Sequence, residues 1–295
     1  MKSQTSLSIS GHKKSYVISQ LSKAFNDRNY ELACYYSVQM HVSNWLSDWW
    51  HIVVCFAAKN INVNNPKIGK FLYCIVSEYP DISGNTSRKK EIRETIALIS
   101  GVLTFSPKDV IFPMPKAMES TESRSLINCL NFYPIQYIVE RESQSNDSIL
   151  ILKIMSKIVQ SIEDGNCQES FRLIGLCLYL EKEKEFKEKI KCGYRNWEGI
   201  SEKQRSDWVF LFWDIIVHIS TKNTELYNII ISWRNLYVKS YITQKRNSLW
   251  SYFVNCIILL THPLKIDIKC VQNEDVINKG CGNIDILYKQ ITLKN

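Results

Sequence analysis

His51 and Cys55 are the residues in this chain whose spacing best suits a metal ion. They lie four positions apart, so on an α-helix both side chains would share one face and supply two ligands of a tetrahedral site. Two ligands are too few, and neither the C-x2-C nor the H-E-x-x-H spacing that usually completes such a site occurs. We therefore interpret the pair as a core thiol beside a partly buried histidine, and we predict no metal and no cofactor.

Cys281 is the thiol that the sequence makes most accessible, because glycines flank it in Lys279-Gly280-Cys281-Gly282. A catalytic cysteine needs a base that meets it in space rather than in sequence, so a Cys–His pair stays open as an alternative. A simple turn also explains the glycines. Neither glycine-rich phosphate-binding motif occurs in the chain. We assign no catalytic residue, and an enzyme whose site assembles only in the fold remains a minor alternative.

Basic residues are densest at Arg88, Lys89 and Lys90, with Arg93 one helical turn further on. Cations at the start of a helix oppose its dipole, which hints at a partner rather than at a stabilising role. Such a patch would bind a phosphate backbone weakly and in a salt-dependent manner. An ordinary surface patch is the simpler interpretation, and the four residues stand as candidates for interaction.

Trp45, Trp49 and Trp50 form the densest aromatic group in the chain. Large aromatic side chains build cores and also anchor protein interfaces. One or two of the three are expected in the core, but three so close together with His51 predict a surface that meets a partner.

Glu181–Lys191 is a run of alternating charge with two i,i+4 pairs, Glu183–Lys187 and Glu185–Lys189. Each pair would add a few tenths of a kcal/mol to a helix. We interpret the run as the solvated continuation of a helix that begins near Phe171.

Composition excludes several classes of protein. Of the 295 residues, 45% are hydrophobic and 12% aromatic, too many for a disordered chain, while 10 glycines and 7 prolines are few for an all-β fold. The ten cysteines are scattered, and Met1–Ser6 is polar with no apolar stretch behind it, so we expect free thiols and an intracellular protein. The longest apolar run, Leu249–Leu260, is too short to span a membrane. The net charge of +8 is spread evenly along the chain.

Apolar residues recur at helical spacing through most of the chain, as at Ile92, Ile96, Ile99 and Leu103. The pattern predicts an all-α antiparallel helical bundle or array with a short irregular or hairpin C-terminal segment. We expect an N-terminal helical subdomain at 1–105, a proline-containing linker at 106–120, a C-terminal helical subdomain at 121–263 and an irregular tail at 264–295.

Two segments of the N-terminal third resemble a known family. They are Ala24-Phe25-Asn26-Asp27-Arg28-Asn29-Tyr30-Glu31-Leu32-Ala33-Cys34-Tyr35-Tyr36 and Cys55-Phe56-Ala57-Ala58-Lys59-Asn60-Ile61-Asn62-Val63-Asn64-Asn65-Pro66-Lys67. They are similar to the C-terminal helical region of the clamp-loader-like RarA/MgsA ATPases, in which a Tyr-Trp helix precedes an alanine-rich helix and a D-I-G-x-A-N-P turn. The ATPase module is absent here, and asparagines replace the glycine and aspartate of the turn. What the resemblance implies is a helical module that supports oligomer assembly.

Stand-alone helical proteins of large nucleocytoplasmic DNA viruses are also similar to this chain, from Lys90–Arg93 through to Leu103–Ser106 and around Asp207–Trp213. We therefore expect a non-enzymatic protein–protein interaction or assembly protein of such a virus, found in the host cytoplasm or virus factory and in the virion. Its expected partners are other viral proteins or a second copy of itself. The alternative is a DNA replication or repair accessory protein with weak nucleic-acid binding.

Overall fold

All the regular secondary structure of the described chain is helical. The structure is a computed structural model that describes residues 7–78, 89–108, 111–183, 185–186, 190–241 and 249–293, without the side chains of Lys89 and Lys203. Thirteen α-helices and no β-strand occur in these ranges, and a single isolated bridge joins Leu7 to Lys13. None of the described helices is long and apolar enough to cross a bilayer. The all-α prediction is confirmed.

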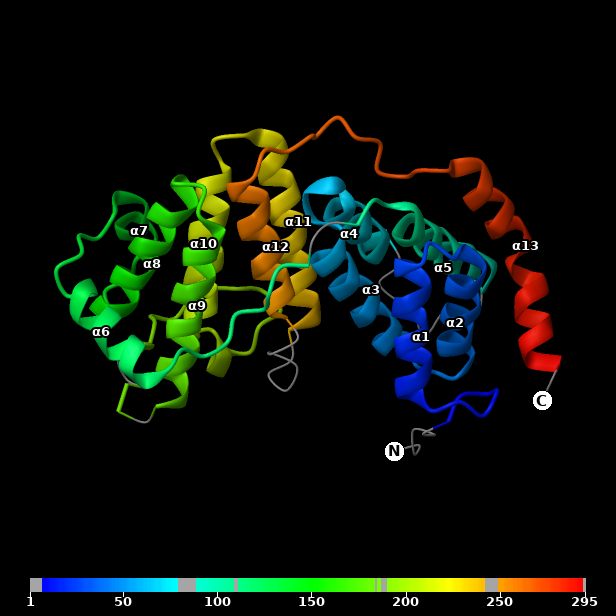
Figure 1. The fold of residues 1–295 in the computed structure, drawn as a ribbon, viewed down its shortest axis with the longest axis horizontal. Coiled ribbons are helices and arrows are strands. Elements are labelled where there is room, and N and C mark those ends of the chain that lie inside the picture. The colour runs from blue at the N-terminus through cyan, green and yellow to red at the C-terminus, as the bar shows by residue number, and fades with distance from the viewer. Residues whose placement is uncertain are drawn as a thin grey trace. The chain divides into compact units, whose positions relative to one another are not determined.

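The chain divides into two compact units, residues 1–110 with 265–295 and residues 111–264. The division falls within residues 106–120, whose described part before Ser120 has no helix. Figure 1 labels the helices of both units. Unit 1 contains α1 (Lys14–Asn26), α2 (Tyr30–Val42), α3 (Leu46–Asn60), α4 (Ile68–Glu78), α5 (Lys89–Phe105) and α13 (Glu274–Leu293). Unit 2 contains α6 (Ser120–Leu130), α7 (Tyr137–Glu142), α8 (Ile149–Glu163), α9 (Cys167–Lys182), α10 (Trp208–Ser220), α11 (Thr224–Ser240) and α12 (Trp250–Thr261).

The turn between α1 and α2 is specified by local chemistry. Asp27 caps the end of α1, and Arg28 takes a positive φ of 55°, which reverses the chain. The side-chain oxygen of Asn29 then accepts a hydrogen bond from the Leu32 backbone N–H at 3.0 Å, which satisfies one of the free donors at the start of α2. The α2 helix therefore begins at a defined residue.

The C-terminal segment differs from the prediction. The irregular or hairpin tail expected at 264–295 is wrong for its second half, because Glu274–Leu293 form the 20-residue helix α13. This helix packs most closely on α5 and α2, far from it in sequence, as Figure 1 shows. Its buried residues Ile277, Ile284, Tyr288 and Ile291 give the apolar stripe that requires a helix rather than a hairpin.

In unit 2, a buried arginine fastens the segment between α9 and α10. Arg195 is 2% exposed and donates to both carboxylate oxygens of Asp147, at 3.0 and 2.8 Å, and to Asp214 on α10 at 3.0 Å. Burial alone would raise the pKa of Asp147, but hydrogen bonds from Arg195, Gln144 and Gly193 hold it below its ordinary value. Asp214 differs, because burial outweighs Arg195 and raises its pKa to about 6.

The charged run after α9 is not the helix that the sequence predicts. Helix α9 ends at Lys182, and Glu183 has extended backbone angles of −83° and 116°. Glu185 lies in a turn and approaches Arg124 at 3.9 Å, whereas Lys187 and Lys189 lie outside the described residues. The prediction of a continuous solvated helix here is therefore wrong. The chain turns at Glu185 and Phe186, and Phe186 is buried with its ring 6.3 Å from that of Tyr179.

Candidate protein-binding groove

Two of the three clustered tryptophans belong to the core. Trp45 is 1% exposed and Trp49 is fully buried, with its indole N–H donating to the Ser37 hydroxyl at 2.9 Å. This agrees with the expectation that one or two of the three belong to the core, and it removes both residues from the predicted interaction surface, because α3 inserts among α1, α2 and α4. Trp50 is half-buried, and its ring lies 6.2 Å from that of Trp49.

The basic cluster is divided between different environments. Arg88 and the side chain of Lys89 lie outside the described residues. Lys90 has a 77% exposed side chain 3.7 Å from Glu94. Arg93 instead forms an ion pair with Asp285 of α13 at 2.6 Å, so this guanidinium anchors a neighbouring helix and is a poor candidate for a phosphate contact.

His51 and Cys55 do meet as the helical spacing predicts, with the sulfur 3.7 Å from Nε2. Within the described residues, no group of three or more His, Cys, Asp or Glu side chains could hold a metal ion. The pair therefore offers two ligands at most, as a half-buried feature of α3.

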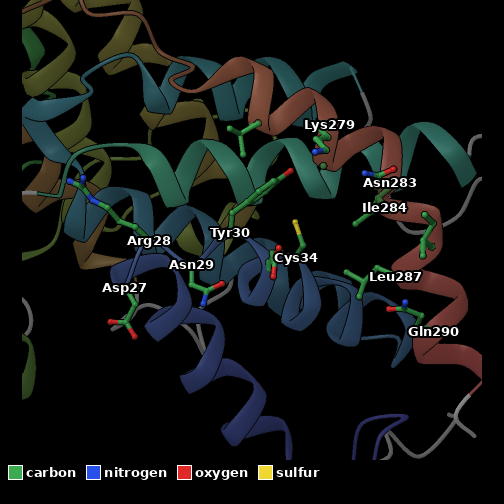
Figure 2. A pocket seen from close by; sticks show the side chains of 14 residues that line it. Asp27, Arg28, Asn29, Tyr30, Cys34, Lys279, Asn283, Ile284, Leu287 and Gln290 are labelled. Atoms are coloured by element: carbon green, nitrogen blue, oxygen red, sulfur yellow. The ribbon is translucent and has the colours of Figure 1, made fainter.

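A groove of about 820 Å³ lies in unit 1 between the start of α2 and one face of α13. Figure 2 shows Asp27, Arg28 and Asn29 at the α1–α2 turn, with Leu287 and Gln290 further along α13. Its lining residues are Asp27, Arg28, Asn29, Tyr30, Glu31, Cys34, Val276, Lys279, Gly280, Asn283, Ile284, Ile286, Leu287 and Gln290. The α13 residues recur at three- and four-residue steps, so the helix presents one continuous face to the groove.

Tyr30 lines the groove and joins α2 to both α5 and α13. Its hydroxyl lies 3.2 Å from the Ala97 carbonyl oxygen and 3.4 Å from that of Ile277. A Cβ at Gly280 would lie 2.3 Å from this hydroxyl, and one at Gly101 would lie 3.1 Å from the ring. Burial raises the pKa of Tyr30, so the phenol stays protonated and can donate. The glycines thus admit Tyr30 between α5 and α13.

The walls of the groove combine apolar side chains with charges of both signs. Val276 is 51% exposed and Ile286 is 56% exposed, which is high for residues of this size. Glu31 on α2 and Lys279 on α13 are exposed at the rim. An open apolar surface with a polar rim is typical of a protein-binding site.

The residues that line the groove are poorly suited to nucleophilic catalysis. Cys34 is the thiol in the lining, and burial raises its pKa to about 12, so almost no thiolate exists near neutral pH. No histidine lines the groove. The lining therefore suits binding rather than acyl transfer.

Two side chains, Arg93 of α5 and His41 of α2, hold α13 in place beside the groove. The Arg93 guanidinium stacks on the Tyr288 ring at 4.6 Å in addition to pairing with Asp285. His41 Nδ1 lies 2.5 Å from the Tyr288 hydroxyl. Burial, and then the charge of Arg93, lower the pKa of His41 to about 4. The ring is therefore neutral near pH 7 and can accept a hydrogen bond from the Tyr288 hydroxyl.

Sequence analysis missed the α13 residues that line the groove. The hairpin expectation concealed them, because the glycines around Cys281 indicate a turn. A signal was present in Ile277, Ile284 and Ile291, which are spaced by seven residues, as on one face of a helix.

Unit 2 has a second hollow of about 710 Å³, between α6 and the start of α8. Ile149, Lys153 and Arg124 line it, together with Glu185 and Phe186. Because residues 187–189 next to it lie outside the described chain, the groove on α13 is the better-defined site.

Comparison of the chain with models of protein families, with curated proteins and with solved structures finds no match. The resemblance to the helical region of the RarA/MgsA ATPases and to viral helical proteins therefore stays a prediction.

Proposed function

We propose that this chain is a non-enzymatic helical protein that binds another protein through the groove between α2 and α13. The observation that carries the proposal is the half-exposed apolar pair Val276 and Ile286 beside charges of both signs. Helix faces of this kind bind an extended or helical segment of a partner by burying apolar anchors. The charges at the rim would set its orientation.

The resemblance of the N-terminal third supports a finer proposal, that the partner belongs to a multiprotein assembly of a large DNA virus, such as its particle. Co-purification of the protein with isolated particles tests this part separately. Its absence from particles and from every viral complex would contradict the viral proposal and leave the groove proposal standing.

A photo-crosslinking amino acid placed at Ile286 tests the groove. Because this side chain is 56% exposed, the replacement should leave the fold intact. We expect a crosslink from position 286 to one protein, either a partner or a second copy, identified by mass spectrometry of the joined peptides. The matched control is Ile111, which is 63% exposed and does not line the groove.

Ile286→Asp provides the complementary loss of function. Placing a charge at an apolar anchor should weaken binding of the crosslinked protein by about tenfold or more, whereas Ile111→Asp should leave it unchanged. No crosslink at position 286, or equal crosslinking at both positions, would contradict the proposed function.

A further inference from the structure

We infer that α13 is a reversibly docked helix, which detaches from α2 and α5 and loses its helical structure in the open state while the rest of unit 1 stays folded. The inference deepens the proposed function and rests on it only for its biological role, because α13 forms one wall of the groove. Opening would dismantle that wall and expose the apolar surface of Cys34, Val38 and Ala97 underneath.

The first argument is the sequence of α13 itself. A glycine inside a helix is unfavourable compared with alanine, and α13 has two, Gly280 and Gly282. Gly280 is required, because a Cβ there would collide with Tyr30. Gly282 is not, since a Cβ at that position would meet nothing within 4 Å and its φ is not positive. Gly282 therefore lowers the helix propensity of α13, although no contact of the helix requires a glycine at that position.

The second argument is how little of α13 is buried. Four of its 20 residues are buried, whereas α3 in the same unit buries eight of 15. Its polar contacts lie in two places: Arg93 and His41 meet Asp285 and Tyr288, and the Tyr30 hydroxyl donates to the Ile277 carbonyl oxygen at 3.4 Å near the start of the helix. An element that buries a small share of its side chains belongs to the low-stability end of a fold.

The third argument is the connection to α13. The segment 262–273 joins it to α12 without any helix, and Asn273 just before it has a φ of 54°. No helix in the connecting segment therefore has to be broken when α13 detaches from α2 and α5.

Two thiols under α13 report its opening without any partner. Cys34 is 6% exposed, and Cys281 is half-buried with its thiol donating to the Glu94 carbonyl oxygen at 3.5 Å. Alkylation of the full-length protein by iodoacetamide, resolved for each cysteine by mass spectrometry, measures how often each thiol is exposed. Cys256 of unit 2, fully buried, serves as the internal reference.

The decisive pair of variants is Gly282→Ala and Gly280→Ala. We expect Gly282→Ala to slow alkylation of Cys34 about fivefold, the factor that corresponds to the helix propensity gained. Gly280→Ala should accelerate it, because the new Cβ meets the Tyr30 hydroxyl at 2.3 Å. Alkylation of Cys256 should stay unchanged in both variants.

Hydrogen exchange of the backbone amides separates opening of α13 from unfolding of the whole unit. We expect α13 amides to exchange before those of α1 and α5, and Gly282→Ala to slow only the former. Exchange of α13 together with α5, or a change of less than twofold in Cys34 alkylation by Gly282→Ala, would overturn the inference. Both readouts use the isolated protein, so they fail or succeed independently of the crosslinking test of the groove.

Discussion

Arg195 shows how much a single side chain contributes when it is buried with its partners. Its guanidinium contacts Asp147 and Asp214, and its carbonyl contacts include Glu142 and Gly193. Removing one member of such a group leaves a buried charge without compensation. In the described part of the segment between α9 and α10, the regular structure is short, as in the 3-10 helix Glu202–Gln204.

Arg195→Ala should destabilise unit 2 by about 3–5 kcal/mol, because Asp147 would stay buried without its counter-ion. The measurement is the midpoint of chemical denaturation followed by tryptophan fluorescence. The control is Arg172→Ala, whose side chain is 39% exposed beside Glu122 and Glu169 and should cost about 1 kcal/mol or less. Equal effects of the two variants would contradict this role of Arg195.

For single residues, the sequence predicted contacts within one helix better than contacts with distant helices. The four-residue spacing correctly brought His51 next to Cys55, since local helix geometry decides that contact. The environment of Trp45 and Trp49 depends on α1, α2 and α4 packing around them, which no local pattern records. The same holds for Arg93, whose partner Asp285 lies 192 positions away.

Among the elements, the docking of α13 should depend on pH through His41. The pKa of this ring is lowered to about 4, against an ordinary value of 6.5, so the opened state takes up a proton first as the pH falls. Docking free energy is therefore fully present above pH 6.5 and should fall by about 1–3 kcal/mol on the way to pH 4. A protonated ring would also lose its acceptor for the Tyr288 hydroxyl.

Alkylation of Cys34 between pH 7 and pH 4.5, corrected for its thiolate fraction in a denatured control, measures this effect. The cluster around His41 also contains Arg93, Asp285 and Tyr288, whose removal would itself weaken the docking of α13. His41→Gln is therefore the better control, because it removes only the titrating ring. We expect the variant to show a flat profile. A profile as steep as that of the unchanged protein would mean that another group titrates.

Elements with a strong apolar period were predictable, and elements stabilised by distant packing were not. The apolar residues from Ile92 to Leu103 lie in α5, because apolar residues at this spacing share one face only when the segment is an α-helix. Helix α13 was missed because Gly280 and Gly282 argue locally for a turn, and contacts with α2 and α5 override that preference. The groove was missed for the same reason, since one of its walls is α13.

For the whole molecule, each unit has its own apolar core. Ile96 of α5 and Ile216 of α10 are both fully buried, one in each unit. Replacing either with alanine should cost about 2–5 kcal/mol. We expect Ile96→Ala to lower the midpoint of one thermal transition and Ile216→Ala that of another, as measured by calorimetry.

Amide exchange then assigns each transition to its unit. A single transition that both variants lower equally would show that the two cores unfold together and would contradict this prediction.

Unit 1 is assembled from both ends of the chain, and this has a consequence during synthesis on the ribosome. Domains generally fold from the N-terminus onward as the chain emerges. Helices α1 to α5 are synthesised well before α13. The apolar surface of Val38 and Ala97 therefore stays uncovered until all of residues 111–264 have been translated. A nascent chain that stalls before Glu274 would therefore expose that apolar surface to chaperones and proteases.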